Sequence, residues 1–144
     1  MLIWGVTAIS GRENPTEVNL RESLVAQETM LEISSIAQQR SGSLDTQVVA
    51  TNIVATTTSD RNNIAELYRS SFGSPPSEPE TQTVEEVDST TGNFDTIYRQ
   101  RVVEYIEISL QRLNYVYANT SDEDLLRAVG TAIENHEAHL SQLQ

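Results

Sequence analysis

The sequence predicts a mainly α-helical protein: a helical bundle with a C-terminal antiparallel helical hairpin, a short N-terminal strand or arm, and an extended acidic linker rich in Pro, Ser and Glu. Apolar residues recur every three or four positions before and after the linker, which is the spacing of one helix face. Helix-start signals precede these stretches, and the apolar residues of the linker show no helical periodicity. At 144 residues one domain is expected, with a core thin enough to gain from a partner. The expected parts are an arm at 1–14, a helical region at 15–72, the linker at 73–92 and the hairpin at 93–144.

The N-terminal part is expected to be a strand or an arm. Residues 2–9 read LIWGVTAI, an apolar and β-prone run that Gly11 ends. Trp4, the one tryptophan of the chain, is therefore a candidate for packing onto another surface. Because no basic residue precedes this run, a secretory signal peptide is not expected.

The first helix is predicted from its start signal. Asn14 can cap a helix, Pro15 suits the first helical position, and Glu17 stands where a capping box places its acid. The helix should run to about Arg40, since Ser-Gly-Ser at 41–43 interrupts it.

Residues 44–58 give conflicting signals. Nine of the thirteen residues from Thr46 to Thr58 are Val, Ile or Thr, which favours a strand. The apolar spacing of the same segment fits a helix better than strict alternation, and we favour the helix. Ser59 or Asp60 is then expected to cap a further helix, which Gly73 stops.

The linker is expected to be extended and to have no core of its own. It holds Pro75, Pro76 and Pro79, five acidic residues and no basic residue.

The C-terminal hairpin carries two apolar stripes joined by a tight turn. Ser121 and Asp124 form a second capping-box pattern at the start of the last helix. If the flanking apolar residues are also to be hidden, a bundle or a ring of subunits must cover them. The expected first stripe is Val103, Ile106, Leu110, Leu113 and Tyr117; the second is Leu126, Val129, Ile133, His136, Leu140 and Leu143; the flanks are Val102, Tyr105, Val116 and Leu125.

The charge balance limits the classes of partner that the chain can be expected to bind. The chain has no lysine, and nine arginines face 21 acidic residues, for a net charge of −12. Each part is negative, with −3 over residues 1–72, −5 over 73–92 and −4 over 93–144. Gripping nucleic acid or an anionic membrane is therefore not expected, although DNA could slide past such a surface. High salt, genome bias and function could each explain the missing lysines.

No catalytic, cofactor or metal site is expected. His136 and His139 share a helix face and could bind zinc with a third ligand, but a hydrogen-bonded histidine in a helix seam is the simpler interpretation. The acidic clusters lie in the linker and at a helix start, where solvation and the helix dipole explain them. Cysteine is absent.

The candidate functional residues are those of a protein interface. Arginine and tyrosine dominate such interfaces and concentrate on the first helix of the hairpin. The candidates are Arg99, Arg101, Tyr105, Arg112, Tyr115, Tyr117, His136 and Trp4.

The expected function is that of a non-enzymatic structural subunit of a large assembly. Its most concrete form is a connector or neck protein, a head–tail adaptor in a tailed virus, arranged in a ring, assembled in the host cytoplasm and carried in the virion. Its partners would be itself and other proteins of that assembly. The alternative is a cellular acidic helical interaction module or assembly chaperone in the cytoplasm, and a small enzyme using His136 is a third class.

Overall fold

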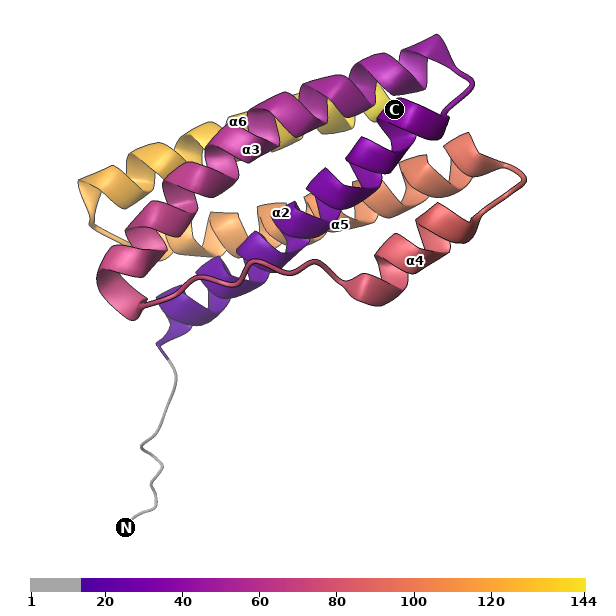
Figure 1. Cartoon of the computed structure of the whole chain (residues 1–144). Helices are drawn as coiled ribbons and strands as arrows, with labels where there is room; N and C mark the ends of the chain where they lie inside the picture. Colours follow the sequence, from indigo (N-terminus) through magenta and orange to yellow (C-terminus); the bar gives the residue numbers. More distant parts are fainter. Residues whose placement is uncertain (1–13) are drawn as a thin grey trace.

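The computed structural model describes residues 14–144, which form five helices and no strand (Figure 1). The strand or arm expected at 1–14, with Trp4, falls outside the described residues except for Asn14. The helices are α2 (Pro15–Arg40), α3 (Leu44–Phe72), α4 (Thr81–Ser89), α5 (Phe94–Asn119) and α6 (Glu123–Leu143). The prediction of a mainly α-helical bundle is confirmed.

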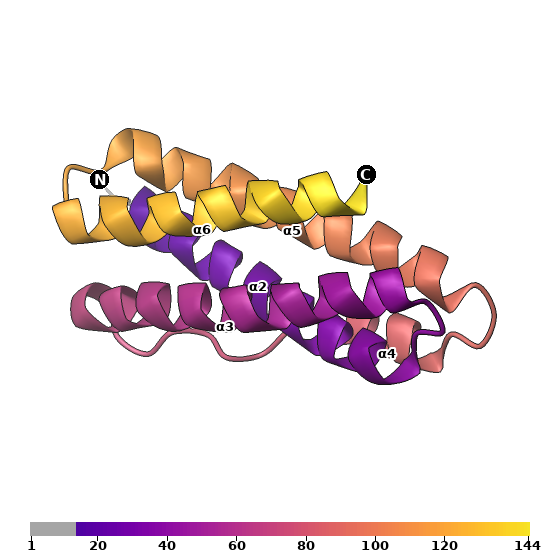
Figure 2. The ribbon, with the colours of Figure 1, turned by 90° about the horizontal axis from the view of Figure 1, so that it is seen from above.

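The four long helices form two antiparallel hairpins that pack side by side (Figures 1 and 2). α2 and α3 are joined by residues 41–43, and α5 and α6 by residues 120–122. α2 packs against α3, α5 and α4, so it is the most enclosed helix. Residues 73–92 run along the bundle from the end of α3 to the start of α5, and we call them the strap (Figure 1).

The first helix begins and ends where the sequence places it. The Asn14 side chain accepts hydrogen bonds from the backbone N–H groups of Thr16 and Glu17, at 2.8 and 3.2 Å. The Glu17 carboxylate does not close a capping box, because it accepts a hydrogen bond from the Tyr68 hydroxyl at 3.1 Å. The same carboxylate lies 3.8 Å from the Arg21 guanidinium.

The structure of α3 differs from the prediction that a second helix begins at Ser59 or Asp60. Residues 44–58 are helical, but the helix continues without a break to Phe72, so neither Ser59 nor Asp60 caps a new helix. Asp60 instead faces α6, where the Asn135 amide donates to both of its carboxylate oxygens at 3.0 and 3.3 Å. The Thr56 and Thr58 hydroxyls bond to carbonyls four residues earlier, which accommodates this Thr-rich run in a helix.

The strap is only partly extended, which corrects the expectation for 73–92. Residues 81–89 form α4, and Val87 is fully buried in the bundle core. The guanidinium of Arg40 donates to the backbone carbonyls of Asp88 and Thr90 at the end of α4, and it lies 4.8 Å from the centre of the Phe94 ring. The strap is thereby fixed to its own bundle.

The C-terminal hairpin forms, but α5 buries a neighbouring face. Val102, Ser109 and Val116 are fully buried, whereas Tyr117 of the expected stripe is 49% exposed. Val102 and Val116 were expected to be flanks, as was Leu125, which is also buried. α2 and α3 cover them within the chain, so no ring of subunits is needed for that purpose. The N-cap of α6 is Asp122 rather than Ser121, since its side chain accepts from the Leu125 N–H at 3.0 Å.

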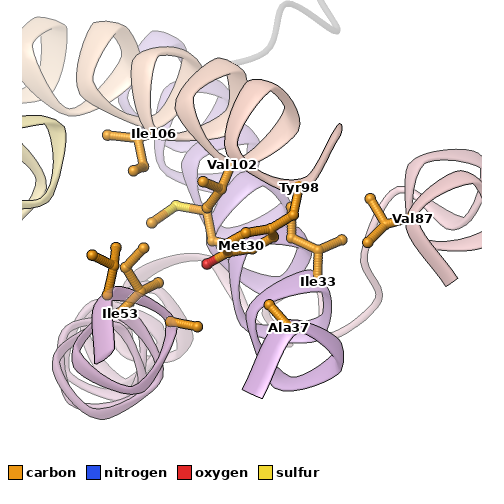
Figure 3. Close-up of a cluster of buried hydrophobic side chains, with 10 residues drawn as sticks. Met30, Ile33, Ala37, Ile53, Val87, Tyr98, Val102 and Ile106 are labelled. Atoms are coloured by element: carbon orange, nitrogen blue, oxygen red, sulfur yellow. The ribbon is translucent and has the colours of Figure 1, made fainter. Parts of the chain in front are cut away.

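The core consists of two hydrophobic clusters along the bundle. Figure 3 shows the first, in which Met30 and Ile33 of α2 meet Ile53 of α3 and Tyr98 of α5. The second lies toward the other end and includes Leu24. Within the described residues, no helix is long and apolar enough to cross a membrane.

Candidate functional site

Polar side chains are fully buried on each of the four long helices of the bundle. Four of them, one from each long helix, are Gln27, Thr57, Ser109 and His136; α2 also buries Ser23, Thr29 and Ser34, and each of these three has a hydrogen-bond partner. All four are fully buried, and we call them the polar layer. Because buried polar groups cost free energy unless they are hydrogen-bonded, the layer is the part of the core that packing alone does not explain.

His136 is held by one neighbour in this layer. Its Nε2 atom lies 2.8 Å from the Ser109 Oγ, while its Nδ1 atom has no hydrogen-bond partner. Burial, with a smaller contribution from His139, lowers the pKa of His136 to about 3. The ring is therefore neutral near pH 7 and, being fully buried, has no contact with a substrate in solvent.

His139 lies one turn later on α6 and is held by a different helix. Its Nε2 atom is 2.6 Å from the Thr56 Oγ1 of α3, and its Nδ1 atom also lacks a partner. Burial lowers the pKa of His139, and the nearby Gln142 side chain opposes that shift. Among the described residues, no three His, Cys, Asp or Glu side chains come close enough together to hold a metal ion.

The other two members of the layer have no partners for their side chains. Both polar atoms of the Gln27 amide and the Thr57 hydroxyl are buried without a hydrogen bond. An unpaired buried group of this kind costs about 1–3 kcal/mol. These two side chains therefore lower the stability of the core.

The buried acids of the bundle are paired. Burial raises the pKa of Asp60, and the hydrogen bond from Asn135 lowers it in part. Glu28 lies 2.6 Å from the Arg61 guanidinium; burial raises the pKa of Glu28, and the positive charge of Arg61 opposes the rise. Both acids therefore have a partner within the chain.

Four of the predicted interface residues make contacts within the chain. Arg101 forms two hydrogen bonds with the Glu86 carboxylate of α4, at 2.7 and 3.0 Å. This interaction lowers the pKa of Glu86 and raises that of Arg101. The remaining three are engaged as follows: the Tyr105 hydroxyl lies 2.6 Å from Thr83 Oγ1, Arg112 lies 2.6 Å from a Glu22 oxygen, and Arg99 donates to Thr46 Oγ1 at 3.1 Å.

The other predicted interface residues are divided between surface and core. Tyr115 and Tyr117 are 40% and 49% exposed on α5, and His136 lies in the polar layer. The structure adds two exposed apolar side chains at the start of α3, Leu44 and Val48. Both residues belong to the apolar spacing of residues 44–58 that favoured a helix over a strand.

The surface offers a groove that does not open into the polar layer. About 470 Å³ of space lies between α2, α5 and the strap, lined by apolar residues such as Val25, Ala26, Pro76 and Ile108. No residue of the polar layer lines it. The buried polar groups are thus separated from this groove.

Comparison with known proteins identifies the fold alone. No protein-family model matches the chain, and no curated protein sequence matches it. One solved structure, described as CopM in the Cu(II)-bound form, superimposes with a TM-score of 0.75 over 89% of this chain and 92% of that one. The two sequences are 13% identical, so the similarity shows that this chain shares the helical fold of CopM.

Proposed function

We propose that this chain is a non-enzymatic structural subunit that works through contacts with other protein chains, including copies of itself. The placement of its chemical groups carries the proposal. The histidines are buried away from solvent, and the buried acids are paired. Apolar side chains, by contrast, stand exposed at Leu44, Val48 and Tyr117. A surface of this kind suits binding to proteins better than chemistry on a small substrate.

A narrower form of the proposal is a ring-forming connector subunit between the head and tail of a virus. Its support is electrostatic. Of the eight arginines in the described residues, seven lie within 4.0 Å of a carboxylate. Little positive charge is left to grip phosphate, so DNA could pass such a surface without being held. The cellular alternative, an acidic adaptor or assembly chaperone, would use the same surface with a different stoichiometry.

Binding of Cu(II), which the description of CopM states for that protein, does not extend well to the residues described in this chain. His136 and His139 are held by hydroxyls from two different helices. No third His, Cys, Asp or Glu joins them among the described residues, and Met30 lies within the hydrophobic core. A Cu(II) site needs more nitrogen or oxygen donors than this pair provides.

The mass of the purified chain in solution tests the proposal. Light scattering during size-exclusion chromatography should give a multiple of the 16.0 kDa protomer. A ring requires more than two copies, because its contacts join two different faces. A dimer would keep the general proposal and contradict the ring. A monomer at all concentrations, with no protein partner recovered, would contradict both.

A further inference from the structure

The start of α3 carries an exposed apolar surface. Leu44 is 73% exposed and Val48, one turn later, is 51% exposed. They line a groove of about 510 Å³ between the beginning of α3, the beginning of α5 and the end of α6. Two large apolar side chains exposed together at one site suggest a contact that the isolated chain does not make.

After Asp45, the helix that carries this surface has a long uncharged stretch. No charged residue occurs between Asp45 and Asp60. The outward side of α5 carries Glu104 and Glu107, and the outward side of α6 has similar acids. In a chain of net charge −12, two copies repel one another over most of their surfaces. The uncharged stretch of α3 that follows Asp45 adds no charge repulsion of its own to such an approach.

Two opposite charges stand beside the apolar pair. Among the described arginines, Arg99 is the one with no carboxylate within 4.0 Å; its Nε donates to the Thr46 hydroxyl at 3.1 Å. Asp45 lines the same groove and likewise has no basic partner within 4.0 Å among the described residues. The terminal nitrogens of Arg99 could therefore bind a carboxylate supplied by another chain.

We propose that this surface joins two copies of the chain around a twofold axis. The inference rests on the general form of the proposed function, self-association, because it names the face through which such a subunit would meet its copy. A twofold contact closes a dimer and does not by itself build the ring. Leu44 and Val48 pack against the same residues of the partner copy, and Arg99 of each copy pairs with Asp45 of the other. A twofold contact makes this exchange reciprocal, so one surface supplies both the apolar centre and the two ion pairs at its edge.

Sedimentation equilibrium of the full chain tests the proposal. Val48→Glu should weaken association at least about tenfold, because it places a carboxylate at the centre of the contact. Asn114→Glu is the matched control: it adds the same charge at an exposed position in the last part of α5, whose end lies away from the start of α3 (Figure 2), and it should leave association unchanged. Circular dichroism confirms that each variant keeps its helices.

The ion pair is tested by charge exchange. Arg99→Asp and Asp45→Arg should each weaken association, and the double variant should restore it toward the wild-type value. A wild-type chain that stays monomeric would overturn both this proposal and self-association as a function. Association that none of these substitutions affects would overturn this surface alone, and single effects without restoration would overturn the reciprocal pairing.

Discussion

The Nε2 atom of His136 lies 2.8 Å from the Oγ of Ser109, and both side chains are fully buried between α5 and α6. Since the Nδ1 atom of the same ring has no partner, this one hydrogen bond is what connects the histidine to its surroundings. The relationship leads to the first prediction.

Ser109→Ala should lower the free energy of unfolding by about 1–3 kcal/mol, because it leaves both ring nitrogens of His136 buried without a partner. Urea denaturation followed by circular dichroism measures the change. Ser59→Ala, at an exposed position of α3, is the control and should change stability by less than about 0.5 kcal/mol. Equal effects of the two substitutions would show that the hydrogen bond contributes nothing.

Stability should fall as the pH decreases from about 6.5. The pKa of His136 is about 3 in the folded chain and near 6.5 when unfolded, so between these values the unfolded state binds the proton more strongly. His139 is shifted in the same direction. Each histidine contributes a slope of up to about 1.4 kcal/mol per pH unit.

The raised pKa values of Asp60 and Glu28 oppose this trend at lower pH, since these acids take up protons more readily when folded. His136→Gln isolates the histidine: urea denaturation from pH 7 to 5 should give a smaller slope for the variant than for the wild type. Identical slopes would mean that His136 is already accessible to protons in the folded chain.

Gln27→Leu should raise the free energy of unfolding by about 1–3 kcal/mol, because it replaces an unpaired buried amide with an apolar side chain of similar size. Gln27→Glu, which has the same shape and adds a buried charge, should lower stability instead. Thermal and urea denaturation of both variants measure the effects. A loss of stability in Gln27→Leu would show that the amide has hydrogen-bond partners in solution.

Arg40→Ala should release the end of α4 while leaving the four long helices folded. Its guanidinium caps the last carbonyls of α4, which otherwise have no partner. Hydrogen exchange measured by mass spectrometry should speed up in residues 81–92 and stay slow in α2. Arg101→Ala removes a solvent-exposed pair with Glu86 and should have the smaller effect. The reverse order would assign the anchoring of α4 to Arg101.

Gly130→Ala should stabilise the protein by about 0.5–1 kcal/mol, because glycine is a poor helix former in the middle of α6. The added Cβ would lie 3.3 Å from Cε2 of the Tyr117 ring, which is half exposed and can move aside. Gly73→Ala should destabilise by about 1–3 kcal/mol, since Gly73 has a φ of +101°. Differential scanning calorimetry of both variants checks the two signs.

The ends of the helices could be predicted from the sequence where the signals are local. Asn14 caps α2 as expected, and the interruption at 41–43 ends it. The prediction that a second helix begins at Ser59 or Asp60 was wrong, because a tertiary contact determines the role of Asp60. Asp60 has the side chain of a helix cap, but its carboxylate bonds to Asn135, 75 residues away in sequence. The partner could not be known from the sequence near Asp60.

The buried face of α5 shows a second kind of error. Leu110 and Ser109 both fall on plausible helix faces, and the apolar residue was the natural choice for the core. The structure buries Ser109 fully and leaves Leu110 partly exposed, because His136 of α6 needs a polar partner at that position. On the same helix, the Tyr98 hydroxyl lies 2.7 Å from the Ser34 hydroxyl of α2. This contact also helps to turn that face of α5 toward the core.

The polar layer and the exposed apolar end of α3 could not be predicted, for opposite reasons. Gln27 and Thr57 have side chains that are common on helix surfaces, whereas Leu44 and Val48 have side chains typical of a core. Each pair occupies the environment that its chemistry does not favour. Such exceptions depend on how four helices pack together, which periodicity in one helix does not specify.

The strap has a consequence for how the chain reaches its fold. Each half of the bundle, α2 with α3 and α5 with α6, is a hairpin closed by three residues, so its contacts are close in sequence. The twenty residues from 73 to 92 then act as a tether that keeps the two halves at a high effective concentration. Val87 and Arg40 hold that tether against α2 once the halves have met. A chain severed in the extended stretch at 74–80 should therefore reassemble from its two fragments, and the fraction reassembled should rise with the protein concentration.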